Sequence, residues 1–261
     1  MRTEILGVGF DDLTPEEAAR RGQALVETEG FHYAVTPNPE FLLTAKKDAP
    51  FRRALLGADL VLADGVGVTY AAKILGRPLK GRVTGIGFAQ GLMTWMARTG
   101  KRLYLLGAKP GVAELAAANL KAQHPGLLVC GTHDGYFSED GPVVEDIRAH
   151  AADVVFVCLG APKQELWMVK HGPASGARLM VGLGGLSAAG AGVAFPPDEG
   201  TQPYWTHVQA APGAGGRLGG AGPGQVKNFR APADGARLYI KSIERCKEDT
   251  ENGYHSIGRG F

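Results

Sequence analysis

The chain has 261 residues, of which 44% are hydrophobic and 21% are charged, a composition typical of a globular protein with a sizeable core in one or two domains. Its 28 Lys and Arg residues nearly balance 26 Asp and Glu residues, so the formal charge of +2 is too small to indicate a nucleic-acid partner. Cysteines at positions 130, 158 and 246 show no CxxC spacing, which favours a reducing, cytoplasmic environment over a disulfide framework.

The sequence has no segment with the character of a signal peptide or a membrane span. Acidic residues at positions 4, 11 and 12 precede any apolar run of signal-peptide length. No stretch approaches the roughly 18 apolar residues that a membrane-spanning helix requires. We therefore expect a cytoplasmic protein whose membrane contact, if it has one, is peripheral.

Short β-rich runs alternate with helical patterns along the first two thirds of the chain. Thr14 followed by Pro15 and two glutamates is the pattern of a capped helix start, and it predicts a helix through about Val26. Strands that alternate with helices predict an α/β, Rossmann-like fold with a mostly parallel sheet and helices on both faces. The predicted strands are 5–10, 32–36, 58–63, 101–107, 127–131, 152–160 and 177–184.

The composition changes in the last third of the chain. Residues 182–224 contain 13 of the 39 glycines and only three charged residues, with no apolar period. We expect an α/β domain over 1–184, a flexible Gly/Ala/Pro-rich segment over 185–224 and a short charged tail over 225–261. A short amphipathic helix is predicted within residues 237–248.

Ligands of parallel sheets bind beyond the carboxyl ends of the strands, so the residues that follow each strand are candidates for a site. Thr36 and Asn38 follow the second predicted strand in a loop that two prolines stiffen. Their hydroxyl and amide groups could bind a polar ligand. The alternative is a simple turn in which Asn38 caps the next helix.

Asp64 ends the next predicted strand, beside two glycines that leave space for a ligand. A carboxylate in that position suits a general base. The alternative is that Asp64 is the N-cap of the helix that continues to Ile74, and the bare sequence somewhat favours this second interpretation.

Two further loops could meet an anion. Arg82 lies just before a predicted helix, where it could bind a phosphate bidentately, although a solvated surface arginine is the commoner outcome. Gly107 begins a loop that joins a strand to a helix N-terminus, a natural anion site. The loop has neither the GxGxxG nor the GxxxxGK[ST] pattern, so standard dinucleotide and P-loop chemistry is not expected.

Two motifs in the second half of the domain add polar and aromatic side chains. Tyr136 follows the fifth predicted strand and could stack on a base or simply pack. Gly160 opens the run GAPKQELW, which places Gln164 and Glu165 on the first turn of a helix. A plain helix start explains Glu165 but says little about Gln164 or Trp167.

Metal and hydrolase chemistry find no support in the sequence. The seven histidines form no HxH, HExxH or Cys/His cluster, so we expect neither a metal nor another cofactor. No GxSxG motif supports a hydrolase triad.

Taken in order, TPNPE, ADLVLADGVGV, GRVTG, YLLGAKPGVAE, DGYF and GAPKQELW resemble the WecG/TagA/CpsF family of bacterial glycosyltransferases over about residues 3–185. The resemblance is specific because six motifs occur in the right order with the right spacing. It implies a metal-independent, inverting transfer of a sugar from a UDP-sugar, typically UDP-N-acetylmannosamine, to polyprenyl-diphosphate-linked N-acetylglucosamine. The products of such enzymes are teichoic-acid linkage units, enterobacterial common antigen or exopolysaccharide.

The resemblance also implies roles for individual residues. Asp64 resembles the family's proposed general base, which would deprotonate the acceptor hydroxyl, and Thr36 and Asn38 resemble the pocket residues beside it. Arg82 would stabilise the diphosphate. The other candidate substrate-binding residues are Gln164 and Glu165, which would contact the donor, and Gly107, Tyr136 and Gly160.

The chain departs from the family pattern in two places. Gly87 stands where the family commonly has Asp. Beyond residue 185, the family usually continues with an Asp-bearing loop, Arg-Ala-Pro and a Trp- and Arg-rich segment that helps bind lipid diphosphate at the membrane. Here a Gly/Ala/Pro tract follows, and an Arg-Ala-Pro at 230–232 has different surroundings. A frameshifted reading, divergence or design would each produce such a tract.

Three functions follow from these patterns. The first is a glycosyltransferase at the inner face of the cell membrane, with a UDP-sugar donor and a polyprenyl-diphosphate-linked sugar acceptor as partners. The second is a nucleotide-sugar-binding protein that has lost acceptor function through its altered C-terminus. The third is a Rossmann-like oxidoreductase, which the absent glycine fingerprint disfavours. The sequence leaves the oligomeric state open, a homo-oligomer included.

Overall fold

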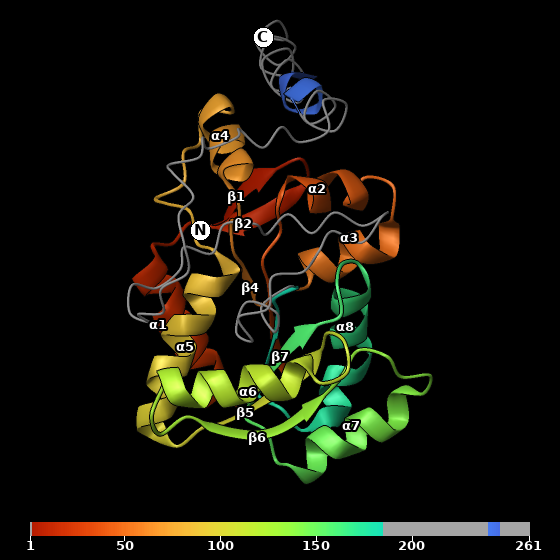
Figure 1. The fold of residues 1–261 in the computed structure, drawn as a ribbon. Helices are drawn as coiled ribbons and strands as arrows, with labels where there is room; N and C mark the ends of the chain where they lie inside the picture. Colours follow the sequence, from red (N-terminus) through yellow and green to blue (C-terminus); the bar gives the residue numbers. More distant parts are fainter. Residues whose placement is uncertain (1, 185–239, 246–261) are drawn as a thin grey trace, which may run out of the picture.

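The computed structural model describes residues 2–184 and 240–245 (Figure 1). Its centre is a parallel six-stranded sheet with the order β4-β3-β8-β7-β5-β6. This arrangement confirms the predicted α/β, Rossmann-like fold. The strands of the sheet are β3 (His32–Val35), β4 (Leu60–Val61), β5 (Arg102–Gly107), β6 (Leu128–His133), β7 (Val154–Cys158) and β8 (Leu179–Gly182).

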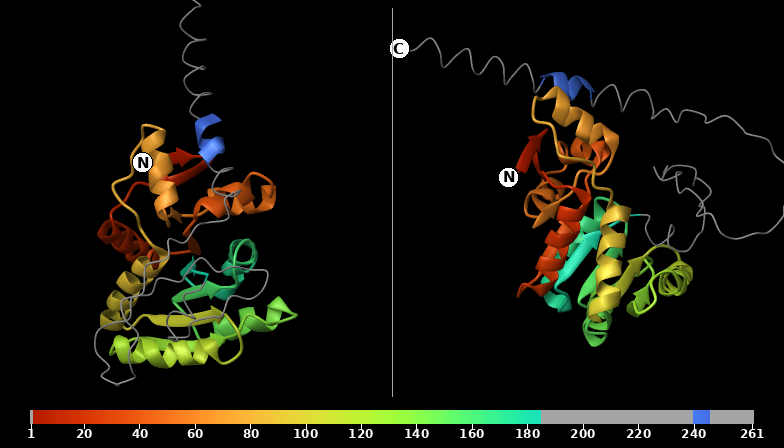
Figure 2. Two further views of the ribbon diagram at one scale, coloured as in Figure 1. Left: turned by 45° about the horizontal axis from the view of Figure 1, so that its top comes forward. Right: turned by 90° about the vertical axis from the view of Figure 1, so that its left-hand side faces the viewer.

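Helices cover both faces of the sheet (Figures 1 and 2). On one face, α2, α3, α7 and α8 share a buried apolar cluster with the sheet. On the other face, α1, α5 and α6 share a second cluster. The helices within residues 2–184 are α1 (Pro15–Glu27), α2 (Pro39–Ala45), α3 (Ala49–Leu56), α4 (Val66–Ile74), α5 (Gly85–Thr99), α6 (Val112–Gln123), α7 (Asp140–Ala149) and α8 (Lys163–Ser175).

The central strand β7 shows why these runs fold as parallel strands. All five of its residues are buried. Val155 and Val157 belong to one apolar cluster, whereas Val154 and Phe156 belong to the other, because successive side chains of a strand point to opposite faces. A continuous apolar run is therefore required wherever helices cover both faces.

The predicted helix after Thr14 is confirmed as α1. The Thr14 hydroxyl accepts a hydrogen bond from the Glu17 N–H (3.2 Å), and the Glu17 carboxylate accepts one from the Thr14 N–H (2.9 Å). This reciprocal capping box satisfies two backbone donors that a helix start leaves free.

The predicted single strand over residues 5–10 is wrong. The segment instead belongs to an antiparallel hairpin of β1 (Arg2–Ile5) and β2 (Val8–Asp11), separate from the main sheet. Leu6 and Gly7 form the two-residue turn with φ of 51° and 78°, the left-handed conformation that tight hairpins need. Leucine is an uncommon turn residue, and the apolar run therefore concealed the turn.

Part of the C-terminal tail packs against the domain. Residues 240–245 are helical, which agrees with the helix predicted within 237–248. Ile243 is fully buried in the same apolar cluster as Val68 of α4, and this short helix lies beside α4 (Figure 2). The segment predicted over 185–224 lies outside the described residues, so the proposed domain boundaries stay predictions.

Candidate active site

The predicted site residues gather at one edge of the sheet. Thr36 directly follows β3, and Asp64 follows β4 by three residues. Gly107 ends β5, Gly160 follows β7 by two residues, and Gln164 lies on the first turn of α8. Because all six strands are parallel, these positions share the carboxyl edge of the sheet, as predicted.

The Asp64 side chain is buried, with an exposed fraction of only 2%. Its Oδ2 atom accepts a hydrogen bond from the backbone N–H of Gly85, at 3.0 Å, where α5 begins. Its Oδ1 atom is also buried and has no hydrogen-bond partner among the described residues. One carboxylate oxygen is thus held by a hydrogen bond, and the other is buried without one.

The structure excludes the alternative in which Asp64 caps α4. The N-cap of that helix is Gly65, with φ of 98° and no side-chain hydrogen bond. The Asp64 N–H instead donates to the Pro37 carbonyl, at 3.3 Å, which ties the loop after β4 to the loop after β3. The Asp64 carboxylate is therefore directed to α5 rather than to the helix that follows it.

Burial raises the pKa of the Asp64 carboxyl above its ordinary value. The hydrogen bond from Gly85 and the positive charge of Arg82 oppose the shift but do not cancel it. Since a carboxylate with a raised pKa holds a proton more strongly, this environment makes Asp64 a stronger base than an exposed aspartate.

Thr36 connects the Asp64 region to the end of β8. Its hydroxyl donates to the Gly182 carbonyl at 3.1 Å. On the other side of Thr36, a Cβ placed on Gly85 would lie only 3.3 Å from the Thr36 Oγ1 atom and 3.1 Å from the Leu183 side chain. The absence of a side chain at Gly85 therefore lets the start of α5 approach both the carboxylate and the threonine.

Asn38 is the N-cap of α2, so the capping interpretation is confirmed. Its Oδ1 atom accepts hydrogen bonds from the N–H groups of Glu40 (2.9 Å) and Phe41 (3.1 Å). Asn38 nevertheless lies near the base, since a Cβ on Gly65 would be 3.9 Å from the Asn38 Cβ. Its side-chain oxygen is committed to the helix, and ligand binding by Asn38 stays a prediction.

Gln164 and Glu165 are bonded to each other inside the protein. The Gln164 Nε2 atom donates to Glu165 Oε1 at 2.7 Å, and Gln164 Oε1 accepts from the Gly184 N–H at 3.2 Å. Both side chains are at most 1% exposed. The pair therefore secures the backbone just after β8, while the predicted contact with the donor stays untested.

The position of this pair depends on a small residue in β8. A Cβ on Gly182 would lie 3.0 Å from Gln164 Nε2 and 3.3 Å from Glu165 Oε1. Gly182 thus carries a carbonyl bonded to Thr36 and leaves the room that the Gln164–Glu165 pair occupies. The end of β8 therefore connects Thr36, near the base, to the Gln164–Glu165 pair.

The remaining predicted residues occupy the rim. Arg82 is exposed and acts electrostatically on Asp64. Gly107 has φ of 124°, and a Cβ there would lie 2.4 Å from the Cys158 carbonyl oxygen, so only glycine permits this approach of β5 and β7. Gly160 is exposed with φ of 76°.

Tyr136 is 70% exposed, so the alternative in which it simply packs is wrong. An Asx turn holds its loop, because the Tyr136 N–H donates to Asp134 Oδ1 at 2.7 Å. The neighbouring Phe137 packs instead, with its ring centroid 6.5 Å from that of Trp167. Base stacking by Tyr136 stays a prediction.

Trp167 has a structural role that the sequence did not reveal. Its Nε1 atom donates to Asp140 Oδ1 at 2.9 Å, which connects α8 to the start of α7. The sequence also gave no indication that Gly85 would hold the base. The usable signal was Thr84, whose hydroxyl accepts from the Gly87 N–H at 3.1 Å as the N-cap of α5.

Among residues 2–184 and 240–245, no group of three or more His, Cys, Asp or Glu side chains is arranged to hold a metal ion. No helix in residues 2–184 or 240–245 combines the length and apolar character needed to cross a bilayer.

Comparison with known proteins shows to which family the chain belongs. The model of the glycosyl transferase WecG/TagA/CpsF family matches residues 3–196. The chain belongs to this family. The resemblance predicted from six sequence motifs is therefore confirmed.

Individual relatives of this WecG/TagA/CpsF member carry a specific name. A protein of Bacillus spizizenii named N-acetylglucosaminyldiphosphoundecaprenol N-acetyl-beta-D-mannosaminyltransferase is 33% identical over 153 residues, or 59% of this chain and 60% of the relative. A Staphylococcus aureus protein with the same name is 30% identical over 187 residues, or 70% of this chain and 73% of the relative. The chain thus spans about 60% of the length of the Bacillus protein that it matches.

The burial of Glu165 predicts a pH-dependent stability. Burial raises its pKa from 4.5 to about 7, so the folded state retains a proton that the unfolded state releases. The free energy of unfolding should fall as the pH rises from about 4.5 to about 7, by on the order of 3 kcal/mol. Glu165→Gln should lack this decline, which denaturant titrations at about pH 5 and about pH 8 would measure.

Glu29→Gln, at an exposed glutamate, is the matched control and should decline as the wild type does. Equal pH dependence in the wild type and Glu165→Gln would contradict the assignment of this titration to Glu165.

Proposed function

We propose that this protein transfers N-acetylmannosamine, or a related sugar, from a UDP-sugar to a polyprenyl-diphosphate-linked N-acetylglucosamine, with inversion at the anomeric carbon and without a metal ion. The names of the relatives support the sugar and the acceptor. The observation that carries the proposal is the Asp64 carboxylate, which is buried at the carboxyl edge of the sheet with one oxygen unpartnered among the described residues.

The proposed reaction needs one base. The acceptor hydroxyl donates its hydrogen bond to Asp64 Oδ1 while the Gly85 N–H holds Oδ2. As the hydroxyl oxygen bonds to the anomeric carbon, its proton passes to Asp64 and the bond between that carbon and the UDP oxygen breaks. UDP departs with the electron pair from the opposite face, which inverts the anomeric configuration.

The leaving group needs positive charge. Arg82 is exposed close enough to Asp64 to lower that group's pKa, and its guanidinium can bind a diphosphate through two parallel hydrogen bonds. The N-termini of helices at the same sheet edge add partial positive charge. In this proposal they take the part that a divalent cation plays in other transferases.

The lipid-linked acceptor implies work at the cytoplasmic face of a membrane through peripheral contact. A second candidate function is nucleotide-sugar binding without transfer. It is favoured by one observation: the family match ends at residue 196, although the chain continues to residue 261. In this second case the donor pocket is retained and the acceptor is not bound.

Replacing the base separates the two functions. Asp64→Asn should bind the UDP-sugar nearly as the wild type does, while turnover falls by at least about 100-fold, because the amide cannot accept the proton. The control is Asp153→Asn at the opposite edge of the sheet, where the carboxylate accepts from the Arg102 N–H at 2.8 Å. Turnover and donor affinity are measured for all three proteins.

Turnover of Asp64→Asn close to that of the wild type would show that another group takes the proton. A wild type that binds the UDP-sugar but transfers nothing would instead support the second function.

Metal independence and the role of Arg82 can be measured together. UDP should bind equally well with and without excess chelator. Arg82→Gln should weaken UDP binding by about tenfold and leave uridine binding unchanged, because only UDP carries the diphosphate. Arg98→Gln, at the other end of α5, should bind UDP as the wild type does. Loss of UDP binding in chelator would contradict the metal-free site.

A further inference from the structure

The helix that follows the proposed base has an unusual outer surface. α4 buries Val68 and Ala72 against the domain but leaves Val66 70% exposed and Tyr70 60% exposed. Val66, Tyr70 and Lys73 have the spacing i, i+4 and i+7, which puts them along one side of the helix. Large apolar side chains therefore stand where a surface helix normally carries polar ones.

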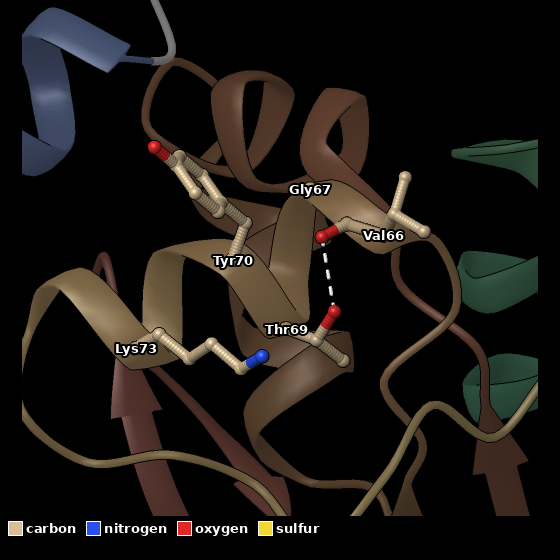
Figure 3. A pocket seen from close by; sticks show the side chains of 5 residues that line it. All are labelled: Val66, Gly67, Thr69, Tyr70 and Lys73. Carbon is tan, nitrogen blue, oxygen red and sulfur yellow. Dashed lines mark hydrogen bonds between the residues drawn. The ribbon is translucent and has the colours of Figure 1, made fainter.

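This side of α4 is hollowed. An open depression of about 450 Å³ is lined by Val66, Gly67, Thr69, Tyr70 and Lys73 (Figure 3). The Thr69 hydroxyl donates to the Val66 carbonyl of its own helix at 3.0 Å, so the free side chains that line the depression are the apolar Val66, the aromatic Tyr70 and the basic Lys73. The Lys73 side chain extends back along the helix towards Thr69 (Figure 3).

The chain segment that contains α4 carries charge of one sign. Residues 65–84 contain four basic and no acidic residues. Lys80 is paired with Glu17 at 3.0 Å, and Arg82 lies beside Asp64. Lys73 and Arg77 are exposed and form no ion pair with another described residue. The surface therefore suits a molecule that combines an anionic group with an apolar chain.

The location of α4 connects this surface to the reaction. The helix begins two residues after Asp64 and rises 1.5 Å per residue, so Lys73 lies about 10 Å along the axis from Val66. In Figure 1, α4 projects outward beyond the edge of the sheet that carries the site. An acceptor whose sugar hydroxyl meets Asp64 must continue outward through its diphosphate to its prenyl chain.

We infer that the outer side of α4 binds the prenyl diphosphate of the acceptor, with the Lys73 ammonium, which reaches back towards Thr69 (Figure 3), on the diphosphate and Val66 and Tyr70 against the first prenyl units. This inference rests on the proposed function. The outer side of α4 is concave, adjoins the proposed base and offers few apolar side chains. These features suit a single prenyl diphosphate better than a broad contact with the bilayer surface.

The test uses the full chain and two sets of changes. The first is the double variant Val66→Ser, Tyr70→Ser, and the second is Lys73→Gln. Binding is measured to N-acetylglucosaminyl-diphospho-undecaprenol in phosphatidylcholine vesicles, and to a soluble short-alkyl ester of N-acetylglucosaminyl diphosphate. The matched controls are Leu128→Ser and Lys121→Gln, which lie towards the opposite edge of the sheet.

The two sets should differ in a defined way. The double variant should bind the lipid acceptor at least about tenfold more weakly and the soluble ester unchanged, because only the prenyl contacts are lost. Lys73→Gln should weaken both ligands. UDP binding should be unaffected in every variant, which also verifies that each one is folded.

Binding of the same proteins to phosphatidylglycerol vesicles without acceptor is measured as well. Three results would overturn the inference: a wild type that does not bind the lipid acceptor, α4 variants that bind it as the controls do, or an equal loss of binding to these anionic vesicles. The last result would make α4 a bilayer contact. A wild type that binds the acceptor through α4 but transfers no sugar would contradict the proposed function and leave the inference intact.

Discussion

The hydrogen bond from the Gly85 N–H to Asp64 Oδ2 (3.0 Å) is the interaction on which the candidate site depends. It is made between the end of one strand and the start of a helix 21 residues later, so it exists only once β4 and α5 have packed together. The bond stabilises a buried carboxylate that would otherwise be costly. The same bond directs Oδ2 towards α5. In our proposal, Oδ1 is therefore the oxygen that takes the proton.

Glycines at the sheet edge let polar groups approach one another closely. Gly85 lets Thr36 pack against the start of α5, and Gly182 leaves room for Gln164 and Glu165. At Gly107, a side chain would clash with the Cys158 carbonyl. These contacts hold the ends of β3, β5, β7 and β8 together along one edge of the sheet. The buried Asp64 lies two residues before α4, whose outer side is apolar and exposed. We propose that Asp64 takes the proton and that α4 binds the lipid.

The sequence predicted what local patterns determine and missed what tertiary contacts determine. The cap at Thr14 was predictable because both partners lie within one turn, and the sheet edge was predictable because parallel strands share a direction. The turn at Leu6 was hidden by an apolar side chain. The partner of Asp64 and the enclosure of Glu165 depend on α5 and β8, which lie far from them along the chain, and no local pattern encodes those contacts.

The central claim is that the donor sugar is positioned at the carboxyl edge of the sheet with its anomeric carbon opposite Asp64. A crystal structure of the Asp64→Asn variant with UDP-N-acetylmannosamine tests it most directly. We predict that the anomeric carbon faces residue 64 across the space for the acceptor hydroxyl, with the diphosphate at Arg82. Donor bound elsewhere, for example in the groove between α6 and β6 lined by Glu114, Lys121 and Cys130, would contradict the account.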